Sequence, residues 1–385
     1  MPLRLISYRT AFIIALVAFF LIPYPSGTGT DEVIAATGFV RTWGYVCDRL
    51  DIPERNRRVG PIYRKTYPLP KEQEHESVSS TNISGPRKTA LLTSTDPAAD
   101  ISVAMGSTEA SSPRTPVFFL SHGGPNVMFE TEHPAYSKLQ QIGHAITHEV
   151  KPKAIVVLSA HWQGEPRIIE VNTAESMGLI YDYYGFPPEY YEVKYPNRGS
   201  PELASKILDL LSQAGIKAEG VRRGLDHGVF AGFRCAFDPD KNPLVIPIVQ
   251  VSLFDSEDPN QHYALGRALS SLRSEGVQII CSGMSVHNLR DMRKAMMLSS
   301  RSPGASLPYA TTFDDALKVA VEKPVQERQK AMAELLKRPD ARQAHPTFDH
   351  LLPVFVAAGA AGHDEGRQTW TMAEGSMAWG QFRFG

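Results

Sequence analysis

The sequence predicts an α/β domain in which a mixed, largely buried central sheet is flanked by helices, and this single domain spans residues 116–385. Short apolar runs alternate here with longer segments whose apolar residues recur at spacings of three and four. The short runs are typical of strands covered on both faces, and the longer segments are typical of amphipathic helices. Their alternation indicates helices layered on one sheet.

The predicted elements follow in chain order. Strands are expected at residues 116–120, 154–158, 167–171, 244–253 and 277–281, most of which are nearly continuous apolar runs. Helices are expected between and after them, at residues 136–150, 201–214, 261–274 and 312–338. Together they make a domain of ordinary size for one hydrophobic core.

The N-terminal part has a different composition. Arg4 and Arg9 precede an apolar run of 12 residues, 11–22, which prolines close. Because roughly 20 apolar residues are needed to span a bilayer, residues 1–27 are predicted as a signal peptide or a membrane anchor giving weak membrane association. A buried or disordered apolar tail is the alternative. Residues 28–115 are rich in Ser, Thr, Pro and charges, which predicts a mostly disordered linker with one short helix at 33–50.

Charge and cysteine content exclude several classes of function. The 40 basic and 41 acidic residues give a net charge of -1, so no general attraction to nucleic acid is expected. The three cysteines have no regular spacing, which argues against a disulfide framework and against a zinc finger. A small ligand fits better. The catalytic domain is of a cytoplasmic type, and the N-terminal segment leaves the location of the protein open.

Five histidines share a context, since each lies after a predicted strand or at a junction between a loop and a helix, beside Gly, Pro or Ser. They are His122, His161, His227, His287 and His345. A single loop histidine is more often a hydrogen-bonded structural residue than a metal ligand. Five in such places favour a shared metal site, because strand ends are where α/β sites assemble and neutral imidazoles suit zinc or iron(II).

The motifs around these histidines carry a resemblance to a known family. SHGGP, SAHW, YDYYGFPPEYY, GLDHG, SGMSVHNL and AHPTFDH occur in this order between residues 121 and 350. The sequence thereby resembles the LigB-like class III extradiol ring-cleavage dioxygenases of the DOPA 4,5-dioxygenase type. The resemblance implies an oxidoreductase that opens the ring of a catechol-type, DOPA-like aromatic diol with both atoms of O2. The first 115 residues lie outside it.

The resemblance also implies roles for the histidines. His122, His161 and His345 correspond to metal ligands and His287 to the acid–base residue. His227 corresponds to a position that either supports the metal ligands or faces the substrate, and it is expected to be a second catalytic residue. Non-haem iron(II) is expected for activity. The wider family completes its metal site with a carboxylate where this sequence offers His345, so zinc(II) in the same site, with His287 as a fourth ligand, stays open.

Other residues are assigned to the substrate or to support. Tyr184, in an aromatic segment at 181–191, is expected to line a planar substrate together with Trp162 and Asn288; a packed surface loop is the alternative. Asp349 and His350 are expected either to orient His345 or to cap the following helix.

Two other functions stay open on the sequence. One is a Memo-like, non-catalytic binding protein, against which the retention of all five histidines argues. The other is a zinc-dependent hydrolase in which Asp226 or Asp349 would act as the base.

Overall fold

The structure is a computed structural model that describes residues 114–301 and 304–385. These residues lie within one compact unit, Gly106–Gly385. The predicted N-terminal targeting segment, the short helix at 33–50 and the linker as far as residue 113 fall outside the described residues. None of the helices that are described is long and apolar enough to cross a bilayer.

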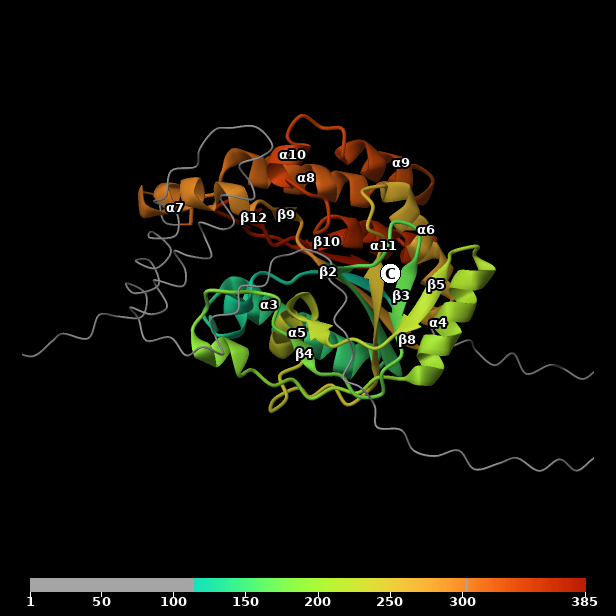
Figure 1. Cartoon of the computed structure of the whole chain (residues 1–385). Coiled ribbons are helices and arrows are strands. Elements are labelled where there is room, and N and C mark those ends of the chain that lie inside the picture. The colour runs from blue at the N-terminus through green and yellow to red at the C-terminus, as the bar shows by residue number, and fades with distance from the viewer. Residues whose placement is uncertain (1–113, 302–303) are drawn as a thin grey trace, which may run out of the picture. The chain divides into compact units, whose positions relative to one another are not determined.

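The core of the domain is an eight-stranded mixed sheet, as predicted (Figure 1). Its strand order is β10-β13-β1-β8-β2-β7-β3-β5. The four central strands are parallel, whereas β13 pairs antiparallel with β1 and β3 pairs antiparallel with β7. The strands are β1 (Val117–Ser121), β2 (Ala154–Gln163), β3 (Ile169–Asn172), β5 (Ala218–Val221), β7 (Ile248–Leu253), β8 (Val277–Gly283), β10 (Gly366–Trp370) and β13 (Gln381–Phe384).

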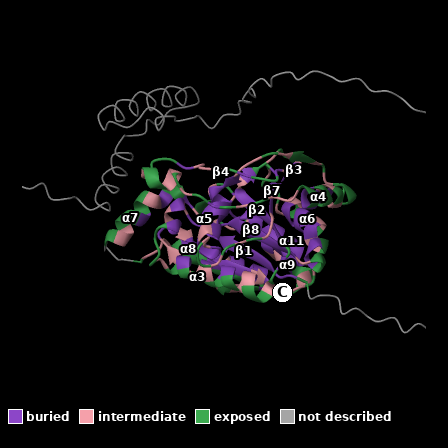
Figure 2. Cartoon of the chain, turned by 90° about the horizontal axis from the view of Figure 1, so that it is seen from below, coloured by how far each residue is buried: buried purple, intermediate pink, exposed green. Residues whose placement is uncertain are grey.

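Helices cover both faces of this sheet. The longer ones are α3 (Pro134–His144), α4 (Pro201–Gln213), α5 (His227–Ala236), α6 (Pro259–Leu269), α7 (Met292–Arg301), α8 (Pro308–Val321), α9 (Val325–Leu335) and α11 (Leu352–Ala361). Side chains alternate along β1, so that Phe119 packs in one apolar cluster with α4, α6, α8, α9 and α11. Its neighbour Phe118 packs in a second cluster with α3 and α5. Figure 2 shows the result, a buried sheet between helices whose outer faces are exposed.

Three predicted helices have a different extent in the structure. The segment 261–274 is α6 followed by a 3-10 helix, η5 (Ser270–Glu275). The segment 312–338 contains most of α8 and all of α9, because Pro324 caps the start of α9 and a proline interrupts helical hydrogen bonding. The segment 136–150 is α3 followed by one π-helical stretch, η3 (Ala145–Val150). Four short 3-10 helices complete the connections, η2 (Pro125–Met128), η4 (Pro188–Tyr191), η5 (Ser270–Glu275) and η6 (Leu289–Asp291), together with the four-residue α10 (Ala341–Ala344).

Two small sheets lie beside the main one and carry predicted site residues. β9 (Val286–His287) pairs with β12 (Met377–Ala378), which pairs with β11 (Ala373–Glu374). β4 (Leu179–Ile180) runs parallel to β6 (Leu225–Asp226), which leads directly into α5. The first small sheet fixes the backbone of His287, and the second fixes the backbone next to His227.

Candidate metal centre

Neighbouring parallel strands carry the first residues of the centre. β8 lies between β1 and β2, and Ser159 of β2 pairs with Ser282 of β8. Because parallel strands end at the same edge of a sheet, His122, directly after β1, and His161, near the end of β2, come together there.

His122, His161 and His227 form a compact group. One ring nitrogen of each lies within 4.8 Å of those of the other two. The ring centroids are 5.2 Å apart for His122 and His161, and 4.1 Å apart for His161 and His227. Three imidazoles at this spacing are a donor set for a divalent transition metal.

His350 lies beside this group of three. Its Nε2 lies 3.1 Å from Nε2 of His161, and its ring centroid lies 5.4 Å from that of His122. It is buried in the turn that precedes α11. Only a supporting role was predicted for His350, whereas the structure places its Nε2 next to a predicted metal ligand.

Two carboxylates hold the outer nitrogens of three of these rings. Asp182 lies 2.8 Å from Nδ1 of His227 and 3.0 Å from Nδ1 of His161, and Asp349 lies 2.6 Å from Nδ1 of His350. An ionised carboxylate only accepts hydrogen bonds, so each Nδ1 carries a proton, and in the neutral form of each ring Nε2 keeps its lone pair. The facing Nε2 atoms of His161 and His350 therefore hold a proton or a metal cation between them.

His122 has the same arrangement with a hydroxyl in place of a carboxylate. Its Nδ1 lies 2.9 Å from Oγ of Ser282, which donates its own hydrogen to the carbonyl of Gly228. Ser282 thus accepts a hydrogen bond from His122 Nδ1, and the Nε2 lone pair of His122 is left for a ligand. All four rings therefore keep Nε2 for a ligand, and three of them, His122, His161 and His227, lie close enough together to hold one metal ion.

Burial and the nearby carboxylates set the charges of the centre. Burial is the main cause that lowers the pKa of His122, His227 and His350, the first of them well below its usual range. Burial also acts against protonation of His161, but Asp182 and further carboxylates outweigh it and raise its pKa. Burial alone would raise the pKa of Asp182, yet hydrogen bonds from two histidines hold it far below the usual range. Neutral rings backed by ionised carboxylates are the forms that bind metal.

Two glycines allow the close approach of these segments. A Cβ on Gly228, the second residue of α5, would lie 2.5 Å from Oγ of Ser159 and 2.6 Å from Cδ2 of His161. Gly123, next to His122, has φ +66°, and a Cβ there would lie 1.9 Å from the ring of Trp379. The small neighbours noted in the sequence are therefore required by packing at the centre.

His287 lies at the edge of the cluster. Its ring stacks on that of His350, with centroids 3.7 Å apart and an angle of 11° between the planes. Among the described residues, no hydrogen-bond partner is found for either of its ring nitrogens. Burial and the adjacent His350 lower its pKa well below the usual range.

The structure does not bring His345 into the cluster, although the resemblance implied that it is a metal ligand. His345 caps the C-terminal end of α10, and its Nε2 lies 2.9 Å from the carbonyl oxygen of Ser285, to which it donates. Its ring packs on Phe313 and Phe348, and burial lowers its pKa to about 4. The physical reason is local, because the hydrogen bond to Ser285 engages the ring of His345. His350, five residues later in the chain, lies next to His161 instead.

The predicted substrate-binding residues are held in other contacts. Trp162 is buried and donates from Nε1 to Glu170 at 2.8 Å. Asn288 is buried, donates to the carbonyl of Gln343 at 2.7 Å, and caps η6. Tyr184 is 70% exposed and stands on the surface. None of the three presents a free group to the histidines.

The rest of the aromatic segment is a loop that is held by hydrogen bonds from its own tyrosine side chains. The hydroxyl of Tyr183 donates to the carbonyl of Tyr190, and the hydroxyl of Tyr181 donates to the carbonyl of Val193, both at 2.6 Å. The ring of Tyr183 meets the ring of His227 edge-on, with centroids 5.4 Å apart. Within the segment, Tyr183 and not Tyr184 is therefore the tyrosine that touches the centre.

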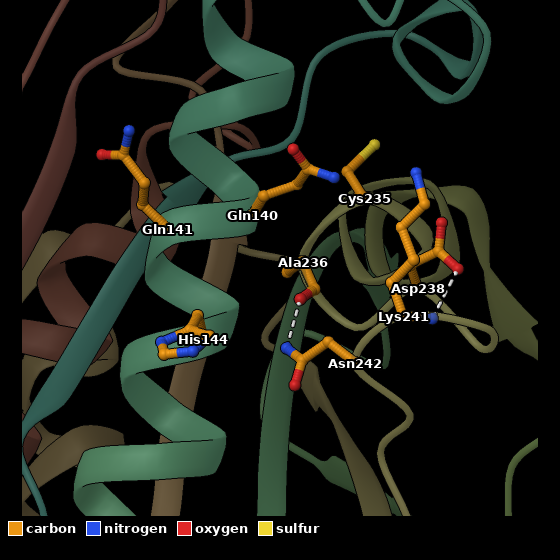
Figure 3. Close-up of a pocket in the computed structure, with 8 residues that line it drawn as sticks. All are labelled: Gln140, Gln141, His144, Cys235, Ala236, Asp238, Lys241 and Asn242. Carbon is orange, nitrogen blue, oxygen red and sulfur yellow. Dashed lines mark hydrogen bonds between the residues drawn. The ribbon is translucent and has the colours of Figure 1, made fainter.

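A surface pocket of about 400 Å³ lies elsewhere on the domain (Figure 3). Residues of α3 and of the segment after α5 line it, and Asn242 donates to the carbonyl of Ala236 at its wall. It contains none of the clustered histidines, so it is separate from the candidate centre.

Comparison with known proteins finds relatives that cover most of the described domain. The family model described as the catalytic LigB subunit of aromatic ring-opening dioxygenase matches residues 115–382. The chain is 35% identical to a 4,5-DOPA dioxygenase extradiol of Beta vulgaris over 69% of this chain and 95% of that protein. It is 33% identical to an Escherichia coli K12 protein of the same name, over 65% of this chain and 86% of that protein.

Two further relatives extend the comparison. The dioxygenase tasH of Hapsidospora irregularis is 37% identical over 66% of this chain and 80% of that protein. The crystal structure of an uncharacterized protein from Escherichia coli K12 superposes with a TM-score of 0.56 at 28% identity, covering 71% of this chain and all of that one. Given the match over most of the chain, this protein belongs to the LigB family of metal-dependent aromatic ring-opening dioxygenases.

Proposed function

We propose that this domain is an extradiol dioxygenase that opens the ring of a DOPA-like catechol with both atoms of O2, using a metal ion held by His122, His161 and His350. The observation that carries the proposal is the cluster of imidazoles in which each Nδ1 has an acceptor, which leaves each Nε2 for a ligand. The names of the Beta vulgaris and Escherichia coli relatives support a DOPA-like substrate.

The donor set whose ring nitrogens lie within 4.8 Å of one another contains His227 as its third member, but we propose His350 as the third ligand because of the spacing of its Nε2 from that of His161. Two nitrogens bound to one ion at about 2.0–2.1 Å are about 3.3 Å apart at tetrahedral angles. The 3.1 Å between Nε2 of His161 and Nε2 of His350 is close to that spacing. We assign His227, which also lies in the cluster, to the substrate side.

The choice of metal follows from the chemistry. Bound iron(II) would supply open coordination positions and a change of oxidation state, whereas zinc(II) would supply Lewis acidity alone. Three protein ligands leave such positions open. We therefore propose non-haem iron(II) for activity, with zinc(II) able to occupy the same site.

His287 supplies the proton transfer in this proposal. Its ring nitrogens are not engaged by described residues, and its ring lies against His350, so a substrate hydroxyl at the centre is within its reach. His287 would accept the hydroxyl proton and return it later in the reaction. Replacing His287 by alanine should leave metal binding intact and lower turnover roughly 100- to 10,000-fold. Loss of the metal would instead make His287 a ligand.

A hydrolase is disfavoured by the state of its two candidate bases. Asp226 is fully buried and accepts hydrogen bonds from Ser159, Arg223 and Gln250. Asp349 is engaged by His350. Asp226 is therefore not free to activate water, and Asp349 has one of its two oxygens engaged by the ring of His350.

The test is anaerobic loading of the protein with iron(II), followed by a panel of catechols in air, with oxygen uptake and the yellow ring-opened product as readouts. Oxygen uptake that depends on both iron and catechol supports the proposal. Metal binding without oxygen uptake on any catechol would favour the hydrolase, and the absence of metal binding would favour a non-catalytic binding protein. Zinc-loaded protein is the matched control and should take up no oxygen.

A further inference from the structure

Asp182 contacts two histidines of the centre at once. Its Oδ1 lies 2.8 Å from Nδ1 of His227, and its Oδ2 lies 3.0 Å from Nδ1 of His161. Oδ1 also accepts the backbone N–H of His227 at 2.9 Å. Both oxygens of one side chain are thus used by the two rings.

The backbone that carries Asp182 is held in register with His227. Ile180 of β4 pairs with Asp226 of β6, so Asp182 and His227 follow the ends of two paired parallel strands. Beyond Asp182 the chain is fixed by the hydroxyl of Tyr183, which donates to the carbonyl of Tyr190. A carboxylate with a fixed backbone on both sides orients its partners more strictly than one in a mobile loop.

The other carboxylate of the centre differs. Asp349 holds one ring, that of His350, the next residue in the chain. Asp182 holds two rings from separate parts of the fold, the end of β2 and the start of α5. Removing Asp182 would free both rings to rotate or to change tautomer, whereas removing Asp349 would free one.

We infer that Asp182 is a positioning residue that fixes the orientation and tautomer of His161 and His227 together, and so aligns the metal ligand with the substrate-facing histidine. The inference rests on the proposed function, in which His161 binds the metal and His227 faces the substrate. Because Asp182 follows Tyr181 in the aromatic segment, it also connects that segment to the metal centre.

The variant Asp182→Asn tests this, because asparagine keeps the shape of the side chain but cannot accept two Nδ1–H donors with both of its polar atoms. The matched control is Asp314→Asn, a buried carboxylate of α8 that bonds Gln368 and Thr371 and touches no histidine of the centre. Zinc(II) affinity is measured by competition with a coloured chelator, and turnover is measured on iron-loaded protein at saturating metal.

Asp182→Asn should bind zinc(II) about 10- to 100-fold more weakly than the wild type, and should also lose turnover when the metal site is full. When Asp182→Asn is added to His227→Ala, zinc affinity should still fall, because this effect acts through His161. Turnover, in contrast, should fall little further than in His227→Ala alone. Asp314→Asn should change neither quantity. Unchanged zinc affinity and turnover in Asp182→Asn would overturn the inference.

Nitrogen-15 NMR of the histidines in zinc-loaded protein separates positioning from a loss of folding. The wild type should show Nδ1–H tautomers for His161 and His227, and a folded Asp182→Asn should lose at least one. The same tautomers in both proteins would contradict the inference. A wild type that binds no zinc would instead refute the proposed function itself.

Discussion

Replacing Gly228 by alanine should push apart the two segments that build the metal centre. The new Cβ would lie 2.5 Å from Oγ of Ser159 and 2.6 Å from Cδ2 of His161. Neither neighbour is free to move, since Ser159 donates to Asp226 at 2.7 Å and His161 lies 3.0 Å from Asp182. Overpacking of this kind costs roughly 1–3 kcal/mol, against a gain of up to about 1 kcal/mol from replacing a helical glycine by alanine.

The matched control is Gly232→Ala, one turn further along α5. There the nearest atom to a new Cβ is Cβ of His122 at 3.4 Å, an ordinary contact. Gly232→Ala should therefore be neutral or stabilising, by up to about 1 kcal/mol. Thermal unfolding should place Gly228→Ala below Gly232→Ala by several degrees, since 1 kcal/mol shifts the midpoint by about 2–4 °C at this size. Zinc affinity should fall only in Gly228→Ala. Equal stability and equal zinc affinity in the two variants would refute the packing argument.

Three further predictions concern other parts of the domain. His350→Ala should lose the bound metal while His345→Ala keeps it, as measured by metal content after dialysis; the reverse result would restore His345 as the ligand. The pair of His133 and Glu374 should stabilise the fold most between about pH 4.5 and 6.5, because their hydrogen bond raises the pKa of His133 above 6.5 and lowers that of Glu374 below 4.5. This contribution is lost as the pH rises through the raised pKa of His133 or falls through the lowered pKa of Glu374. The difference in free energy of unfolding between the wild type and Glu374→Gln should therefore decrease at both ends of the pH range. A difference that stays constant from pH 4 to 9 would exclude a stabilising role of this pair. Removing residues 1–113 should leave a soluble domain with full turnover, and aggregation or inactivity would show that the N-terminal part is needed.

Much of the fold could be predicted from the pattern of apolar residues. The five predicted strands all appear in the sheet, because strands covered on both faces leave a strong continuous signal. β5, β10 and β13 were missed, since these short strands towards the sheet edges alternate or mix polar and apolar residues. Every residue of α11 is buried, so no helical period marks that helix.

Only the site residues that lie at the ends of predicted strands could be predicted with their positions. His122 and His161 follow from their places after β1 and on β2, but two histidines five residues apart, His345 and His350, cannot be ranked from spacing. Their roles depend on which backbone carbonyl lies near each ring, and the carbonyl of Ser285 accepts a hydrogen bond from His345. Asp182 is separated in sequence from both histidines that it holds, and only the pairing of β4 with β6 brings it to them.

The most direct test of the account is the fate of oxygen during turnover of the iron-loaded protein on a catechol. With isotopically labelled O2, the ring-opened product should carry both labelled atoms, and one O2 should be consumed for each catechol. Oxygen consumed without incorporation into the product, or product formed without oxygen, would contradict the assignment of ring-opening dioxygenase chemistry to this centre.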